Sequence, residues 1–179
     1  MNRTIAAVSV CSDLVPNIPD SLQEPFRSAL SAASNAWLAL MRDKLVCLVL
    51  FGSVARRQAA DSSDIDLLVV AEGFPRSLRD RRRPLLDAWE RTQAAKGLPH
   101  VEWSLVTKSP DEARFHSPLY LDIVEDGILI LDRDRFFEQI LSEMRERMRA
   151  LGSRRVYLED GSWYWDLKPD FRWGEIVEI

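Results

Sequence analysis

Two apolar stretches near the middle of the chain most constrain what it can fold into. Leu45–Phe51 is apolar throughout, and Asp64–Val70 is apolar except for Asp64 and Asp66 at its start. Apolar runs of this length are typical of strands that are covered on both faces. The sequence therefore predicts a β-sheet that is flanked by helices.

The segments around these strands predict the rest of an α/β domain with a mixed sheet. A capping-box pattern at Ser21 and Glu24 precedes apolar residues at three- and four-residue spacing up to Leu40, which predicts a helix with one buried face. Asp160-Gly161 predicts a two-residue turn in a C-terminal β-hairpin. Further helices are expected over much of 77–95, in a segment that begins at Ser109, in a short segment that ends at Val124, and over 134–150. Strands are expected at 101–107 and 127–131.

No repeat, low-complexity tract or linker points to a second domain, and 179 residues suffice for one substantial core. We therefore expect a single domain over residues 1–179. It comprises an N-terminal arm (1–20), a core (21–131) and a C-terminal helix with the hairpin (132–179).

Composition narrows the classes of function. The net charge of -4 argues against broad nonspecific binding to nucleic acid, although a nucleic acid stays open as a specific substrate. Cys11 and Cys47 are too few for a disulfide framework, and His100 and His116 are too few for a histidine-rich zinc site. The N-terminus lacks a signal-peptide pattern and nothing in the chain reads as a membrane span, so a cytoplasmic protein is expected.

The most informative motif joins the two apolar stretches. Ten residues separate Gly52-Ser53 from Asp64-Ile65-Asp66. Side chains alternate faces along a strand, so Asp64 and Asp66 point to the same side, where a metal ion would relieve their mutual repulsion. The turn at Gly52-Ser53 offers backbone N–H groups to an anion. A hard cation beside a phosphate cradle is what nucleotidyl transfer requires.

Further residues complete the expected site. Glu102 interrupts an otherwise apolar strand and is the best candidate for a third acidic residue, which would complete the metal site and help deprotonate the attacking hydroxyl. Arg56 or Arg57, directly after the turn, would offset charge as pyrophosphate leaves. The expected metal is Mg²⁺, or Mn²⁺ in its place, held by Asp64, Asp66 and Glu102.

This motif resembles the signature of the DNA polymerase β-like nucleotidyltransferase superfamily. The closest resemblance is to its minimal nucleotidyltransferase branch, which is often paired with HEPN-domain toxins. The motif itself covers Leu45–Val70, and a looser resemblance runs to the C-terminus. It implies a metal-ligand role for Asp64 and Asp66 and a phosphate-binding role for Gly52 and Ser53. Family members usually carry Asp where this chain has Glu102.

Motif and resemblance together predict Mg²⁺-dependent transfer of a nucleoside monophosphate, AMP, from ATP or another nucleoside triphosphate to an acceptor hydroxyl. Family members that act on tRNA, poly(A) or aminoglycosides usually carry an added helical domain, for which this chain has little room. An acceptor presented by another macromolecule is therefore favoured, specifically a HEPN-type partner toxin that is inactivated by AMPylation. Three alternatives stay open: a small-molecule nucleotidyltransferase that works as a homodimer, a non-catalytic antitoxin or nucleotide-binding module, and a purely structural domain.

Two clusters have both a functional and a plainer interpretation. The arginines could guide a triphosphate or RNA, but a solvated face with some ion pairing is the simpler interpretation. The aromatic residues could stack on a base, but packing of the hairpin into the core or a dimer seam is favoured. The arginines are Arg76, Arg79, Arg81, Arg82 and Arg83, and the aromatic residues are Trp163, Tyr164, Trp165, Phe171 and Trp173.

Overall fold

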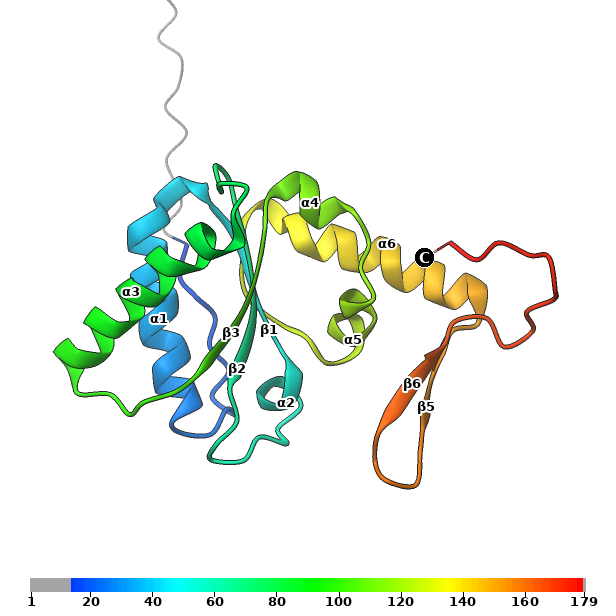
Figure 1. Cartoon of the computed structure of the whole chain (residues 1–179), viewed down its shortest axis with the longest axis horizontal. Helices are drawn as coiled ribbons and strands as arrows, with labels where there is room; N and C mark the ends of the chain where they lie inside the picture. The colour runs from blue at the N-terminus through cyan, green and yellow to red at the C-terminus, as the bar shows by residue number, and fades with distance from the viewer. Residues whose placement is uncertain (1–13, 179) are drawn as a thin grey trace, which may run out of the picture.

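A computed structural model describes residues 14–178, and the first thirteen residues of the expected N-terminal arm, with Cys11, lie outside the described residues. Four strands form a mixed sheet in the order β3-β2-β1-β4, and helices cover both of its faces (Figure 1). The strands are β1 (Leu45–Phe51), β2 (Ile65–Ala71), β3 (Trp103–Lys108) and β4 (Ile128–Asp132). The helices are α1 (Phe26–Met41), α2 (Gly52–Ala55), α3 (Leu78–Lys96), α4 (Pro110–Arg114), α5 (Leu119–Asp126) and α6 (Phe136–Leu151), with 3-10 turns at Arg42–Lys44 and Arg133–Arg135. A separate hairpin consists of β5 (Arg154–Tyr157) and β6 (Trp163–Asp166).

The sheet is the middle of three layers. Helices α1 and α3 cover one face, whereas α4, α5 and α6 cover the other (Figure 1). The alternation of β2 divides the core, because Leu67 and Val69 pack toward α1 and α3 while Leu68 and Val70 pack toward α5 and α6. Every residue of β1 is buried. The predicted mixed sheet flanked by helices is therefore confirmed.

Strand directions set the geometry of the site. β1 is antiparallel to β2 and β4, so its end at Phe51 lies opposite Asp66 at the start of β2. β2 and β3 run parallel, which places the starts of both strands at the same edge of the sheet. The functional motif therefore gathers at one end of the sheet, beside α2.

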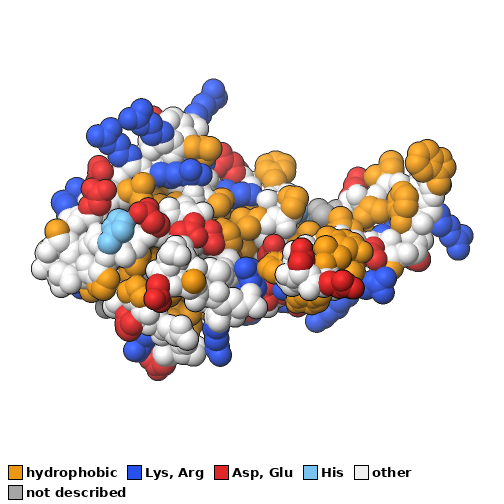
Figure 2. Space-filling model, turned by 60° about the horizontal axis from the view of Figure 1, so that its bottom comes forward, with side chains coloured by type: hydrophobic (Ala, Val, Ile, Leu, Met, Phe, Trp, Pro, Cys, Tyr) orange, Lys and Arg blue, Asp and Glu red, His pale blue; other side chains and the backbone are white. Residues whose placement is uncertain are grey.

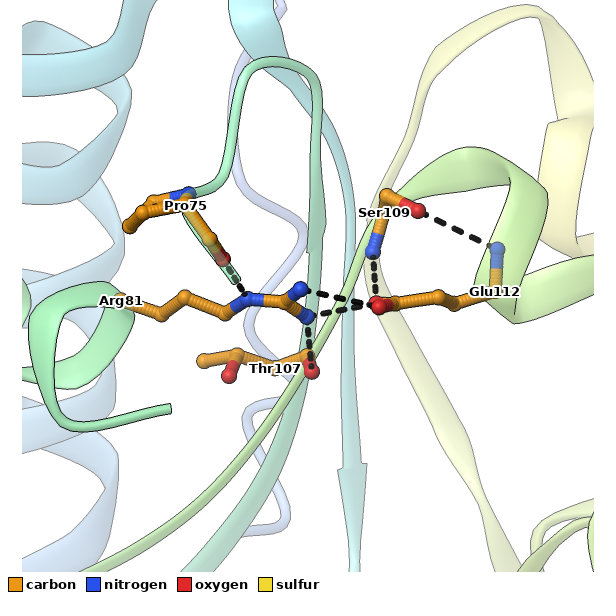
Figure 3. Close-up of polar contacts among 5 residues, drawn as sticks. All are labelled: Pro75, Arg81, Thr107, Ser109 and Glu112. Carbon is orange, nitrogen blue, oxygen red and sulfur yellow. Dashed lines mark hydrogen bonds and ion pairs between the residues drawn. The ribbon is translucent and has the colours of Figure 1, made fainter. Parts of the chain in front are cut away.

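Arg81 joins three segments at the other end of the sheet (Figure 3). Its side chain is only 6% exposed, and it donates to the carbonyl oxygens of Pro75 and Thr107 and to both carboxylate oxygens of Glu112. Glu112 also accepts from the Ser109 N–H, within a capping box at the start of α4, where a helix was expected from Ser109. A solvated face is therefore the wrong interpretation for Arg81, whose charge is buried against a partner that is distant in the sequence.

Two local predictions are wrong. The first helix begins at Phe26 without a side-chain cap, because the Ser21 hydroxyl accepts from Arg57 and the Glu24 carboxylate accepts from the Ser28 N–H. The hairpin turn is longer than the expected two residues. The Leu158 N–H donates to the carbonyl oxygen of Ser162 at 2.8 Å, and three residues lie between these two. The predicted end of α6 is confirmed, with Gly152 in the left-handed conformation.

Candidate active site

Gly52 and Asp66 are in direct contact where β1 gives way to α2. Gly52 has φ +74°, and a Cβ at this position would lie 2.0 Å from Asp66 Oδ2. Only glycine fits both the positive φ and the missing space. The backbone of the expected phosphate-binding turn therefore runs directly against a carboxylate.

Asp66 lies on the face of β2 that points toward α5 and α6, since residues two apart on a strand share a face and Leu68 and Val70 pack there. Asp64 precedes the strand and is exposed. The pKa of Asp66 is raised, and burial of the carboxylate is the main cause. The charge of Asp64 also raises this pKa, whereas a hydrogen bond from Ser104 and the charge of Arg56 lower it. The site thus disfavours the ionised form of Asp66 on balance, and a bound cation would relieve that cost.

Ser104 is a site residue that the sequence prediction missed. It pairs with Asp66 across the parallel β2–β3 ladder, and its hydroxyl bonds to the Asp66 carboxylate. The alternation of 102–106 placed Ser104 on the same face as Glu102, which was the available signal. The register between the two strands was needed to match Ser104 with Asp66.

Glu102 lies at the edge of this arrangement. It precedes β3, where its carbonyl oxygen accepts from the Ile65 N–H at 2.9 Å. Its side chain is 74% exposed and contacts His100 Nε2 at 2.7 Å. Among residues 14–178, no three His, Cys, Asp or Glu side chains are gathered into a metal site. The backbone thus brings Glu102 beside the aspartates, but its carboxylate does not join theirs.

The two arginines after the turn point in different directions. Arg57 has φ +59° and donates to the Ser21 hydroxyl at 3.0 Å. Arg56 donates to the Gln58 side chain at 3.2 Å and lies close enough to lower the pKa of Asp66. Of the two, Arg56 is placed to act on charge in the site. Ser53 is partly buried within α2, and its carbonyl oxygen accepts from the Gln58 N–H.

The end of the molecule that carries this site is open to solvent. Figure 2 brings that end forward and shows acidic side chains across the middle of the face, with basic and hydrophobic side chains around them. No helix within residues 14–178 is long and apolar enough to cross a membrane.

Comparison with known proteins identifies the family. The family model described as "Polymerase beta, Nucleotidyltransferase" matches residues 38–136, which run from α1 through the sheet to the start of α6. A protein of Methanocaldococcus jannaschii that bears the name protein adenylyltransferase MJ1305 is 32% identical over 109 residues, 61% of this chain and 74% of that protein.

Solved structures resemble the chain more distantly. A crystal structure of a toxin-antitoxin with AMP-PNP is 24% identical, with a TM-score of 0.43 over 65% of this chain and 89% of that one. A mutant of the toxin-antitoxin MntA-HpeT is 20% identical, with a TM-score of 0.42 over 63% of this chain and 84% of that one. At these scores the family assignment depends on the two sequence matches. The chain is a nucleotidyltransferase that belongs to the polymerase β family.

Proposed function

We propose that this protein transfers AMP from ATP to a hydroxyl group of another protein. The contact between Gly52 and Asp66 carries the proposal, because it sets a turn suited to phosphates against a carboxylate suited to a metal. The relative named as a protein adenylyltransferase supports ATP as donor and a protein as acceptor. A HEPN-type toxin is the specific acceptor that the family resemblance implies.

The residues of the site fit Mg²⁺, the metal that the family implies. Asp64 and Asp66 offer carboxylate oxygens, which are the hard ligands that Mg²⁺ prefers. The missing side chain of Gly52 lets the Asp66 carboxylate lie directly against the backbone of the turn, where a Cβ would displace it. Asp64 and Asp66 would hold the ion, and the remaining ligands would come from outside the chain. When bound, Mg²⁺ supplies positive charge beside the phosphates.

In the proposed reaction the acceptor hydroxyl oxygen forms a bond to the α-phosphorus of ATP. The bond from that phosphorus to the oxygen bridging the β-phosphorus breaks, and pyrophosphate leaves. Arg56 offsets the charge that develops on pyrophosphate. Glu102 takes the proton of the hydroxyl, and in this role it exchanges its His100 contact for the acceptor.

The test is transfer of label from ATP to protein. The purified protein is incubated with Mg²⁺ and α-labelled ATP in lysate from its source organism, beside a γ-labelled control. We expect protein label from the α position alone, and mass spectrometry of the labelled band then identifies the acceptor and the modified residue. The double variant Asp64→Asn/Asp66→Asn is expected to lose the label, whereas Asp61→Asn, which removes an exposed carboxylate between the two motifs, keeps it. Label found only in small molecules would overturn the protein acceptor, and label that survives the double variant would overturn the site.

A further inference from the structure

We propose that Trp163, on the hairpin, is a positioning residue that holds Arg56 toward Asp66 and the phosphates of the bound nucleotide. This inference rests on the proposed function. The Arg56 guanidinium carbon lies 4.7 Å from the centre of the Trp163 ring, within the range of a cation–π contact. Strand β6, which carries Trp163, follows the residues that the family model matches, so the contact adds a part of this chain to the family site.

Arg56 needs such support because its other contacts are weak. Within residues 14–178 it forms no ion pair, and its hydrogen-bond partner is the exposed side chain of Gln58 at 3.2 Å. An arginine side chain without a fixed partner samples many rotamers, and ordering it on nucleotide binding would cost affinity. Stacking on an aromatic ring restricts the guanidinium before the nucleotide arrives.

The hairpin that presents Trp163 is itself fixed. Asp122 of α5 accepts from Trp163 Nε1 at 3.2 Å, from Trp165 Nε1 at 3.0 Å and from Arg155 at 3.2 Å. Arg155 is 10% exposed and also pairs with Asp126 at 2.7 Å. Helix α5 covers the face of the sheet toward which Asp66 points. These contacts anchor the hairpin on the same side of the sheet as the Asp66 carboxylate.

The same geometry argues against stacking of a nucleotide base on Trp163. Two guanidinium groups already contact the ring, those of Arg56 at 4.7 Å and Arg155 at 5.1 Å. A cavity of about 180 Å³ lies beside the contact and is lined in part by Arg56, Gln58 and Trp163. Trp163 therefore acts on the site through Arg56.

A double-mutant cycle on ATP affinity tests the inference. Affinity for ATP with Mg²⁺ is measured by calorimetry for the full chain, for Arg56→Ala, for Trp163→Ala and for the double variant. Each single change is expected to lower affinity about tenfold, and the double variant is expected to lose little more, because both remove the same interaction. Trp163→Phe keeps a ring face without the indole N–H and is expected to restore most of the affinity. Tyr164→Ala changes an exposed neighbour on the same strand and is expected to bind as the unchanged protein.

The outcomes separate the inference from the proposed function. The inference, but not the proposed function, would be overturned if Trp163→Ala leaves the affinity for ATP unchanged. It would also be overturned if the losses of affinity in the two single variants add fully in the double variant. A folded, unchanged protein that fails to bind ATP with Mg²⁺ would overturn the proposed function, and the positioning role with it. If Trp163→Ala unfolds the chain, Trp163→Leu against Trp163→Phe decides: equal affinities for the two variants would exclude a role for the ring.

Discussion

The Asp66 carboxylate occupies the space in which a side chain at Gly52 would lie, and a Cβ there would come within 2.0 Å of Oδ2. Gly73 has nearly the same φ, +73°, but a Cβ there would meet only the end of the Lys44 side chain at 3.9 Å. The two glycines thus share the backbone strain that a side chain would introduce and differ in what that side chain would displace. Comparing them separates strain from displacement of the carboxylate.

We expect Gly52→Ala to abolish metal-dependent ATP binding, since Asp66 has to leave its place. Gly73→Ala is expected to cost about 1 kcal/mol of stability through strain alone and to leave ATP binding unchanged. Thermal unfolding and calorimetric titration of both variants check this pair. Equal ATP affinities for the two variants would contradict the role of the Gly52–Asp66 contact.

Asp66→Asn is expected to stabilise the metal-free protein at neutral pH while abolishing transfer. Burial raises the pKa of Asp66, so the folded chain binds more protons than the unfolded chain between the ordinary pKa and the raised one. The free energy of unfolding therefore falls as pH rises through that window, and the cost of the ionised form persists above it. Removing this cost is expected to raise Tm in EDTA, because each kcal/mol of stability corresponds to about 2–4 °C in a chain of this size. At a pH below the ordinary pKa of aspartate, the difference between the two proteins should shrink.

Glu102→Gln is expected to slow transfer at saturating ATP by about 100-fold, because an amide cannot take the hydroxyl proton. His100→Ala releases the Glu102 carboxylate from its 2.7 Å contact and is expected to leave the rate unchanged or faster. Single-turnover rates of both variants provide the measurement. A Glu102→Gln rate equal to that of the unchanged protein would leave Asp64 and Asp66 as the whole acidic site.

Arg81→Ala is expected to lower the free energy of unfolding by about 3 kcal/mol, because Glu112 and two carbonyl oxygens lose their buried donor. Arg83→Ala is the matched control on the same helix. That side chain is 68% exposed and lies 3.9 Å from Asp87, so a change within about 0.5 kcal/mol is expected. Urea unfolding of both variants measures the difference.

The same pair predicts a pH dependence. The hydrogen bond from Arg81 lowers the pKa of Glu112 from 4.5 to about 2. The folded chain then binds fewer protons than the unfolded chain between these values, so the stabilisation is complete above about pH 4.5 and is lost as pH falls toward 2. Because Glu112 is 47% exposed, solvent screening keeps this contribution to about 1 kcal/mol. Acid unfolding of Glu112→Gln should lack this component, and an unchanged acid midpoint would contradict it.

Local pattern was enough to predict the central strands. Leu45–Phe51 is buried because its apolar run fits only a position covered on both faces. Asp64 precedes β2, and the shared metal-ligand role of Asp64 and Asp66 stays a prediction. Contacts between distant segments were not visible in the sequence. Ser104 reaches Asp66 through the register of two parallel strands, and Arg81 is buried because Glu112 lies beside it in space. The role of Glu102 as the third acidic residue stays a prediction, because its exposed side chain contacts His100 and not the aspartates.

The contact between Arg56 and Trp163 also links the C-terminal hairpin to the core. The four strands and their covering helices form two apolar clusters, to which the hairpin strands contribute only the partly buried Trp165. The hairpin is held mainly by polar contacts to Asp122 and Asp126. A change in those contacts would therefore alter the surroundings of Arg56 while leaving the apolar core intact.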